Sequence, residues 1–224
     1  MFPHPISLRL RATFVKAVLR ILLAITPRRV KTLGIDLAVP RHCFTPLLTI
    51  TTKALATLAR ALVRLKDEGL LLDVGTGVGA IALASASPGW FVVGTDIDLK
   101  CLKASRDNAL RNGLYALYSP VACDSASAFR DEVFDLVTVN PPYLPLNPSS
   151  RYDVSICGGL SEEISMWMIE TSYRSLRRRG VLLAASSSIS VRLTSKLAAM
   201  GARRVLEYVT PLDTVMIWVL VKKS

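Results

Sequence analysis

The stretch that decides the fold is FDLVTVNPPY, which runs from Phe134 to Tyr143 of a 224-residue chain. Its apolar and β-branched residues, up to Val139, are typical of a buried strand. The two prolines then end the strand, because proline has no N–H for the ladder and biases the preceding residue toward extended backbone. A strand that ends in Asn-Pro-Pro-Tyr leads either into a simple turn or into a stiff platform that presents an amide, free carbonyls and a ring to a ligand.

Strands and helices alternate on both sides of this stretch. Hydrophobic periodicity predicts strands over 70–74, 91–95, 117–122, 134–139 and 181–186, and helices over 50–66, 78–86, 99–112, 161–178 and 190–200. Two further strands, 203–209 and 214–221, are joined by a connection so short that they must pair antiparallel. The expected fold class is therefore α/β: a Rossmann-like, seven-stranded, mostly parallel sheet with an antiparallel C-terminal strand pair and helices on both faces.

The N-terminal part of the chain carries the whole excess of positive charge. Residues 1–66 hold 12 of the 28 basic residues but only one of the 17 acidic ones, so they account for the net charge of +11. They begin with a predicted helix over 6–26 and a short strand over 34–39. We interpret residues 1–46 as a basic extension and residues 47–224 as the main domain. The charges either face solvent or form an electrostatic footprint for RNA or an acidic partner.

Composition narrows the cellular context. Basic residues interrupt every apolar stretch near the N-terminus, and no segment reaches the roughly 18 apolar residues of a membrane span. The cysteines show neither close pairing nor the spacing of metal ligands, and they are Cys43, Cys101, Cys123 and Cys157. We therefore expect reduced cysteines, no metal site and a cytoplasmic location.

A glycine-rich turn follows the strand that ends at Val74. In LLDVGTGVGA, which runs from Leu71 to Ala80, glycines would let the backbone approach a ligand closely and supply N–H groups to it. The spelling also satisfies the G-x-G-x-x-A signature, so a dinucleotide-binding fold is a formal alternative. A tight turn between strand and helix would need no ligand at all.

Acidic residues lie at the ends of three successive predicted strands. Asp73 precedes the glycine turn, Asp96 lies 21 residues after Gly75, and Asp124 ends the next strand. An acid in the position of Asp96 accepts hydrogen bonds from ribose hydroxyls, and Asp124 could accept one from an adenine amino group. One such acid could be a helix cap, but three are harder to explain that way. The expected cofactor contacts are Asp73, Gly75, Thr76, Gly77, Gly79, Asp96, Ile97, Asp124, Ser125 and Asn140.

In this order and spacing the motifs resemble class I S-adenosylmethionine-dependent methyltransferases. The Asn-Pro-Pro-Tyr motif, Cys157-Gly158-Gly159-Leu160 and the run from Ser175 to Gly180 are similar to the HemK-type protein-glutamine methyltransferases, in particular the short archaeal and eukaryotic branch. The resemblance implies S-adenosylmethionine as cofactor and a glutamine side chain of a translation release factor as substrate. It also implies that a small zinc-binding activator subunit could be a partner.

The chemistry expected of the motif is orientation of a poor nucleophile. An amide or exocyclic base nitrogen has a delocalised lone pair, so the Asn140 side-chain carbonyl and the Pro141 backbone carbonyl would each accept one N–H and favour the growing positive charge. Pro142 completes the substrate platform, and Tyr143 would stack on the planar group. No general base is required before transfer, and we expect His4 and His42 to be non-catalytic.

Two other functions remain open. An RNA or DNA base carrying an exocyclic amine offers the same chemistry as glutamine, and the basic residues 1–66 could contact RNA or the ribosome. An NAD-dependent oxidoreductase would fit the glycine turn. That hypothesis assigns no role to Asn140, Pro141 and Tyr143.

Overall fold

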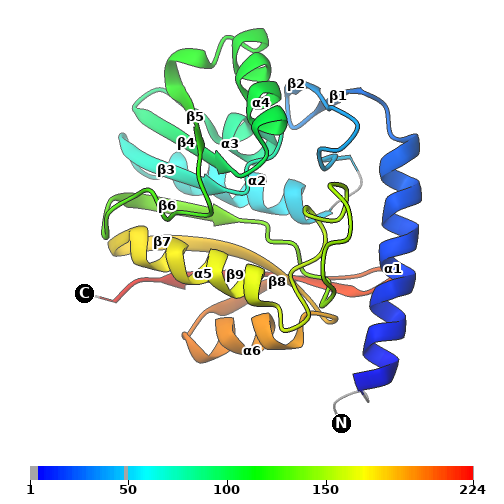
Figure 1. The fold of residues 1–224 in the computed structure, drawn as a ribbon. Coiled ribbons are helices and arrows are strands. Elements are labelled where there is room, and N and C mark those ends of the chain that lie inside the picture. The colour runs from blue at the N-terminus through cyan, green and yellow to red at the C-terminus, as the bar shows by residue number, and fades with distance from the viewer. Residues whose placement is uncertain (1–4, 48–49, 224) are drawn as a thin grey trace.

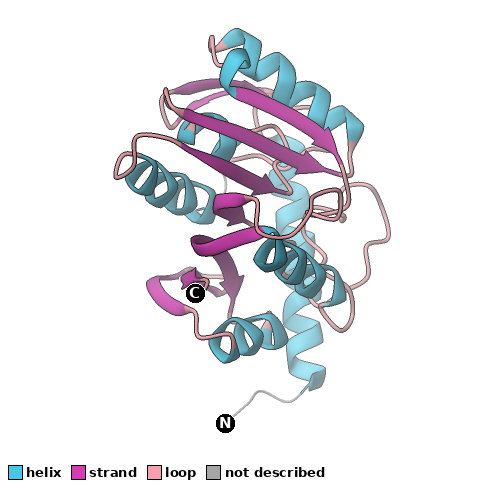
Figure 2. Cartoon of the chain, turned by 90° about the vertical axis from the view of Figure 1, so that its left-hand side faces the viewer, coloured by secondary structure: helices cyan, strands magenta, loops and turns pink. Residues whose placement is uncertain are grey.

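The computed structural model describes residues 5–47 and 50–223, which form a twisted seven-stranded sheet between two layers of helices (Figures 1 and 2). The strands lie in the order β5-β4-β3-β6-β7-β9-β8. β9 runs in the opposite direction to the other six strands of this sheet, because it lies between β7 and β8 and pairs antiparallel with both. The predicted fold class is confirmed. The strands are β3 (Gly69–Val74), β4 (Trp90–Asp96), β5 (Tyr118–Ala122), β6 (Phe134–Val139), β7 (Leu176–Ser187), β8 (Arg203–Val209) and β9 (Thr214–Val221).

Alternation along the central strands separates the two faces of the sheet. On β3, Leu71 packs in the cluster of α2 (Ile50–Val63), α3 (Ala80–Ser85) and α4 (Leu99–Arg111). The next residue, Leu72, packs in the opposite cluster with α5 (Glu163–Ser175) and α6 (Val191–Ala199). A strand buried on both faces reads as a continuous apolar run, which explains why β3 and β6 lack a polar alternation.

The N-terminal segment packs against the main domain at two places. In α1 (Pro5–Ile25) an apolar stripe of Ala12, Val15, Leu19 and Leu23 packs against the loop that follows β6, which lies beside α1 in Figure 1. No helix in the described residues is long and apolar enough to cross a membrane. Residues 1–4, including His4, lie outside the described part of the chain.

A hairpin of β1 (Arg29–Thr32) and β2 (Ile35–Ala38) forms the second contact. Two asparagines, Asn108 in α4 and Asn112 directly after it, bind the backbone of β2. The amide oxygens of Asn108 and Asn112 accept the Ala38 and Asp36 N–H groups at 2.8 and 2.9 Å. The sequence analysis missed β1, because four residues with alternating basic side chains carry little strand signal until β2 pairs with them.

The predicted helix over 161–178 begins two residues too early and ends three residues too late, because α5 spans Glu163–Ser175. It ends at Ser175 because Leu176, which is fully buried, leaves the helix and pairs with Phe134 as the first residue of β7. The three arginines that follow therefore lie on a strand. A short 3-10 helix, Tyr115–Leu117, also precedes β5.

Candidate active site

One cleft lies at the carboxyl edge of the sheet, where β3, β4, β5 and β6 end. Parallel strand ends meet at this edge, so residues far apart in sequence gather there. Gly79 is the one expected cofactor residue that does not line the cleft, since its missing Cβ would point at Leu83 and Ser105. The other expected residues all line it: Asp73, Gly75, Thr76, Gly77, Asp96, Ile97, Asp124, Ser125, Asn140, Pro141, Pro142 and Tyr143.

Asp73 holds the glycine turn in shape. Its buried carboxylate accepts hydrogen bonds from the hydroxyls of Thr76 and Thr138 at 2.8 and 2.7 Å, and from the Ala82 N–H at 3.3 Å. Burial raises the pKa of Asp73 to about 6, although these hydrogen bonds oppose the shift. Because the protein already uses both carboxylate oxygens, the main effect of Asp73 is on the position of the turn.

Gly77 and Asp96 form the next part of the floor. Gly77 has φ of +56°, and a Cβ there would meet nothing within 4 Å, so the space in front of this backbone is open. The Asp96 carboxylate accepts the N–H groups of Gly77 and Asp98 at 2.8 and 2.9 Å, one on each oxygen. Burial raises the pKa of Asp96, again opposed by those bonds. Each oxygen keeps a lone pair, so the anchored carboxylate can accept two hydroxyls, as a ribose would offer.

Ile97 and Asp124 line the cleft just after the neighbouring strands β4 and β5. The exposed Asp124 accepts a hydrogen bond from the Ser125 hydroxyl at 3.1 Å, and Ser125 itself has a left-handed backbone with φ of +56°. The side chain of Ile97 is 60% exposed. An apolar surface beside a carboxylate acceptor suits a nucleobase that carries an amino group.

The Asn-Pro-Pro-Tyr platform keeps two acceptors unused. The Asn140 amide donates to Thr52 Oγ1 at 3.4 Å, but its buried Oδ1 has no hydrogen-bond partner among the described residues. The Pro142 carbonyl accepts from the Ser165 hydroxyl, whereas no described donor reaches the Pro141 carbonyl. Both unused oxygens belong to residues that line the cleft.

Tyr143 lines the cleft and also packs against the α1 cluster. Burial, with a smaller contribution from the charge of Asp213, raises the pKa of Tyr143 well above its usual value. The phenol is therefore a neutral ring at any physiological pH, which suits contact with a planar group.

Gly158 lets a second backbone segment pack against the Asn-Pro-Pro-Tyr platform and hold it in place. The chain after Tyr143 returns beside it, where Leu144 N–H donates to Ile156 at 2.9 Å and Gly158 N–H donates to Leu144 at 2.8 Å. A Cβ on Gly158 would overlap the Pro142 carbonyl and the Ser165 hydroxyl. Only glycine lets the two backbone segments approach this closely.

Sequence reasoning missed three segments of the cleft wall. They are the loop that carries His42, Cys43, Phe44 and Pro46, the loop over 151–156, and the α5 side chains Ile164 and Met168. None of them carries a motif of its own. One local signal was present at Asp98, which precedes a predicted helix and caps α4 by accepting the Lys100 N–H at 2.8 Å.

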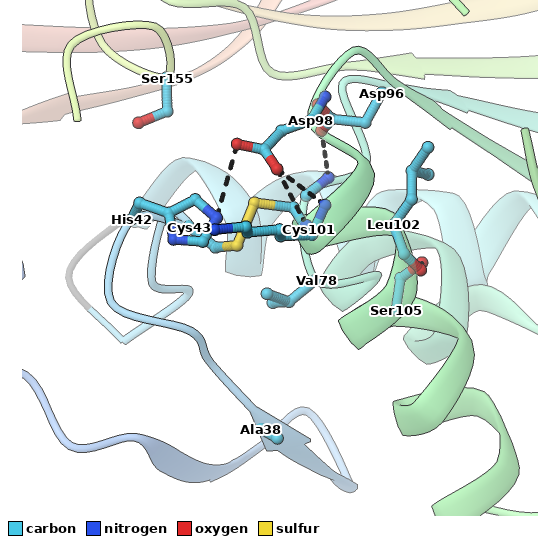
Figure 3. The surroundings of a disulfide bond; sticks show 12 residues. Ala38, His42, Cys43, Val78, Asp96, Asp98, Cys101, Leu102, Ser105 and Ser155 are labelled. Atoms are coloured by element: carbon cyan, nitrogen blue, oxygen red, sulfur yellow. Dashed lines mark hydrogen bonds and ion pairs between the residues drawn. A yellow bond between two sulfur atoms is a disulfide. The ribbon is translucent and has the colours of Figure 1, made fainter. Parts of the chain in front are cut away.

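The expectation of four reduced cysteines was wrong for two of them. Cys43 and Cys101 form a disulfide whose Cα atoms lie 5.7 Å apart, although 58 residues separate them in sequence. Figure 3 shows Cys43 beside the first turn of α4, where the folded chain brings the two residues together. Spacing along the sequence could not reveal this pair. Cys123 and Cys157 are free.

His42 lies next to the disulfide and lines the cleft. Its Nε2 is 3.5 Å from Asp98 Oδ2. In the described residues one group has the composition of a metal site, His42 with Cys43 and Cys101, but its two sulfurs are bonded to each other. That His42 takes no part in catalysis stays a prediction.

The family described as "Methyltransferase small domain" matches residues 51–190, which is more than half of the chain. The match includes the glycine turn, all three acid-bearing strand ends and the Asn-Pro-Pro-Tyr platform. It confirms the resemblance to methyltransferases that the motifs indicated.

Individual relatives match over shorter ranges. A "Release factor glutamine methyltransferase" of Bradyrhizobium diazoefficiens is 47% identical over 77 residues, which are 34% of this chain and 26% of that protein. A "tRNA1(Val) (adenine(37)-N6)-methyltransferase" of a Flavobacteriaceae bacterium is 30% identical over 93 residues, 41% of this chain and 40% of that protein. The chain thus spans about a quarter to two-fifths of the length of these curated relatives.

Among solved structures, the ribosomal protein L11 methylase of Lactobacillus delbrueckii subsp. bulgaricus has a similar fold. It superposes with a TM-score of 0.59 at 21% identity, over 83% of this chain and 84% of that chain. Identity at this level shows a shared fold.

Proposed function

The chain belongs to the methyltransferase small domain family, and we propose that it methylates the side-chain amide nitrogen of a glutamine in a translation release factor, with S-adenosylmethionine as cofactor. The domain over residues 47–224 would carry the chemistry, and residues 1–46 would be an extension that completes the cleft. Several relatives are named release factor glutamine methyltransferases, which favours this substrate.

The cleft fits the proposed cofactor. S-adenosylmethionine would supply a methyl group already activated on a sulfonium. Asp96 would hold the ribose hydroxyls, and Asp124 would accept from the adenine amino group above Ile97. The backbone at Gly75 and Gly77 would lie against the rest of the cofactor. The anchored Asp96 carboxylate and the open space at Gly77 support this assignment.

The observation that carries the proposal is the unpartnered Oδ1 of Asn140. A buried acceptor left without a donor costs about 1–3 kcal/mol, so the free protein bears a penalty that a bound N–H would remove. A glutamine amide offers two N–H groups, and the Asn140 and Pro141 carbonyls offer two acceptors. Held in this way, the nitrogen has its lone pair directed and its developing positive charge stabilised by fixed dipoles.

Tyr143 and Gly158 would define the shape of the substrate-binding site. The Tyr143 ring would stack on the planar amide, and Gly158 would keep the Pro142 backbone in place beneath it. No side chain need remove the proton before transfer, because the nitrogen becomes acidic once it carries a fourth substituent. The release factor is the proposed protein partner.

An activator subunit would need an apolar surface on the sheet edge. β8 is an edge strand, and Val205 and Val209 on it are 44% and 81% exposed. An unpaired edge strand with exposed valines is a surface that proteins normally cover. We therefore include a small activator protein among the proposed partners.

The second candidate is an exocyclic amine of an RNA base. The same pair of acceptors would hold an adenine or guanine amino group, and the tRNA methyltransferase relative favours this alternative. The excess of basic residues in 1–66 also favours it.

A labelling experiment distinguishes the two. The protein, with radiolabelled S-adenosylmethionine, is incubated in parallel with a purified release factor, with the same factor after Gln→Ala at the accepting glutamine, and with ribosomal RNA. We expect label only in the release factor that keeps the accepting glutamine. Label in RNA alone would establish the second candidate, and label in the Gln→Ala factor would exclude glutamine as the acceptor.

A further inference from the structure

A second hollow lies where the C-terminal half of α1 meets the loop that follows β6. We call it the arginine pocket, and it is lined by Arg20, Ala24, Arg28, Arg41, Ser150 and Tyr152. We propose that the arginine pocket binds the phosphodiester backbone of RNA beside the active-site cleft. This binding goes beyond the proposed function, because it does not depend on which nitrogen is methylated.

The pocket carries positive charge that the protein does not neutralise. The acid behind it is Asp153, which is fully buried and is shared by Arg20 at 2.8 Å and Lys16 at 2.9 Å. That carboxylate is therefore already matched by two cations. Arg28, which follows α1, donates a hydrogen bond to the Ala24 carbonyl of that helix at 3.3 Å. Among the described residues no carboxylate pairs with Arg28 or Arg41.

Placing several guanidinium groups around one hollow costs Coulomb repulsion, which a bound anion would remove. The planar fork of each guanidinium matches two oxygens of a phosphate, and guanidinium is more weakly hydrated than ammonium. Ser150 Oγ accepts from Arg20 at 3.1 Å, so its own hydroxyl hydrogen can be donated to a phosphate oxygen. The donors around the pocket thus outnumber the acceptors, as a phosphate site requires.

Tyr152 adds a feature that a simple anion would not need. Its side chain is 41% exposed at the wall of the pocket. Aromatic rings beside a cationic groove are the usual platforms on which proteins stack the bases of single-stranded nucleic acid. An arginine cluster with an exposed ring therefore favours RNA over an acidic protein segment. The carboxylates of such a segment would pair with the arginines but would make no stacking contact with the ring.

Two chain segments contribute residues to both the arginine pocket and the active-site cleft. Arg41 directly precedes His42, which lines the cleft, and a Pro40-to-Cys43 turn with a hydrogen bond of 3.0 Å leads into the disulfide. On the opposite side Arg151 lines the cleft, while its neighbours Ser150 and Tyr152 line the arginine pocket. A polyanion bound to the arginines would therefore lie beside the active-site cleft.

Fluorescence anisotropy tests the proposal without any methylation step, so its outcome is independent of the proposed function. The probe is a labelled single-stranded oligouridylate of about 15 nucleotides, a length that spans a typical single-strand site. The test variant is Arg28→Ala/Arg41→Ala, which leaves Arg20 in place to hold Asp153. The matched control is Arg64→Ala/Arg203→Ala. It removes the same charge from exposed positions near the amino ends of β3 and β8, on the opposite edge of the sheet.

We expect the wild type and the control to bind the probe with nearly equal affinity, and the test variant to bind about 10²-fold more weakly. The slope of log K against log salt should flatten by about 1.4 in the test variant, since each lost phosphate contact on a single strand contributes about 0.7. Thermal unfolding of both variants checks that they fold.

Several outcomes would overturn the proposal. One is the absence of RNA binding by the wild type, and another is equal loss of binding in both variants. A test variant with wild-type affinity and slope would also exclude the pocket. If polyglutamate of the same charge displaces the probe as well as unlabelled RNA does, the pocket is a site for acidic protein segments and RNA is the wrong ligand.

Discussion

The active-site cleft is lined both by the strand ends of the sheet and by the N-terminal segment. The two regions are held in place by different interactions. Asp73 and Asp96 lie in the last residues of β3 and β4, and Asn140 directly follows β6, so the backbone ladders of these strands fix the three residues relative to one another. His42 and Cys43 belong to a segment that lies outside the main sheet. A disulfide joins that segment to α4, and ion pairs to Asp153 join α1 to the loop after β6.

This difference has a physical consequence. A residue at a strand end moves only if the sheet moves, and the sheet is the most deeply buried part of the molecule. A residue on the N-terminal segment depends on a few specific links. Removing one link should therefore change stability first and chemistry second, whereas truncating a strand-end residue should change chemistry and leave stability almost intact. Four experiments test this contrast, from the largest expected effect to the smallest.

Removing the disulfide should have the largest effect. We expect Cys43→Ser/Cys101→Ser to lower the free energy of unfolding by about 4 kcal/mol, because a cross-link over 58 residues restricts the unfolded chain. Denaturant unfolding of the wild type and the variant under non-reducing conditions measures it. Cys123→Ser, at a free cysteine, is the control and should change little. Equal unfolding midpoints for the wild type and the double variant would show that the link does not constrain the chain.

Asn140→Ala should be next. We expect turnover to fall about 10²–10³-fold, equivalent to about 3–4 kcal/mol of barrier, because a fixed acceptor for the substrate N–H is lost. Steady-state kinetics measure the turnover, and calorimetry with S-adenosylmethionine should show nearly unchanged cofactor affinity. If affinity for the cofactor collapses while the saturated enzyme turns over normally, Asn140 is a cofactor residue and the assigned role is wrong.

Asp96→Ala should have a smaller effect, seen mainly in cofactor binding. We expect binding to weaken by about 1.5–3 kcal/mol, the size of hydrogen bonds to a charged group. Calorimetry measures it, with Asp107→Ala as the control, since Asp107 lies on α4 and forms a surface ion pair with Lys103. Wild-type affinity in Asp96→Ala would remove this carboxylate from the site.

Asp153→Asn should have the smallest effect, about 1–2 kcal/mol of stability near neutral pH. The amide keeps the shape but loses the ion pairs, and partial exposure of Arg20 reduces what they contribute. Burial alone would raise the pKa of Asp153, but hydrogen bonds from Arg20 and Lys16 outweigh burial and hold that pKa well below its ordinary range.

The pH dependence of that variant follows from the lowered pKa. The stabilisation is fully present above the pKa of an unfolded Asp, about 4, and is lost as the pH falls from there through the lower folded value. Unfolding measured from pH 7 to pH 3 should therefore show the wild type approaching the variant at the acid end. The control is Asp131→Asn, which removes an exposed ion pair between Asp131 and Arg174. A difference between wild type and Asp153→Asn that grows toward low pH would contradict the assignment.

The sequence was sufficient for the sheet and for its ligand edge because both rest on local patterns. Apolar runs such as Leu70–Val74 and Phe134–Val139 must be buried, and prolines or glycines must end them, whatever the rest of the chain does. The boundary at Ser175 could not be predicted, because helix and strand compete there and the burial of Leu176 beside Phe134 decides between them. The hairpin strand β1 was missed for the same reason, since its pairing with β2 supplies the signal that its own four residues lack.

By itself the sequence determined the order of the strands and helices, the acids at the strand ends and the platform that begins at Asn140, because periodicity and backbone chemistry act over a few neighbouring residues. The tertiary structure alone decided which distant residues meet. It placed Cys43 against Cys101, Arg20 against Asp153, and Arg41 and Tyr152 around one pocket. These contacts join segments about 60 to 130 residues apart, and only the complete packing of the core specifies which of the many conceivable pairs can form.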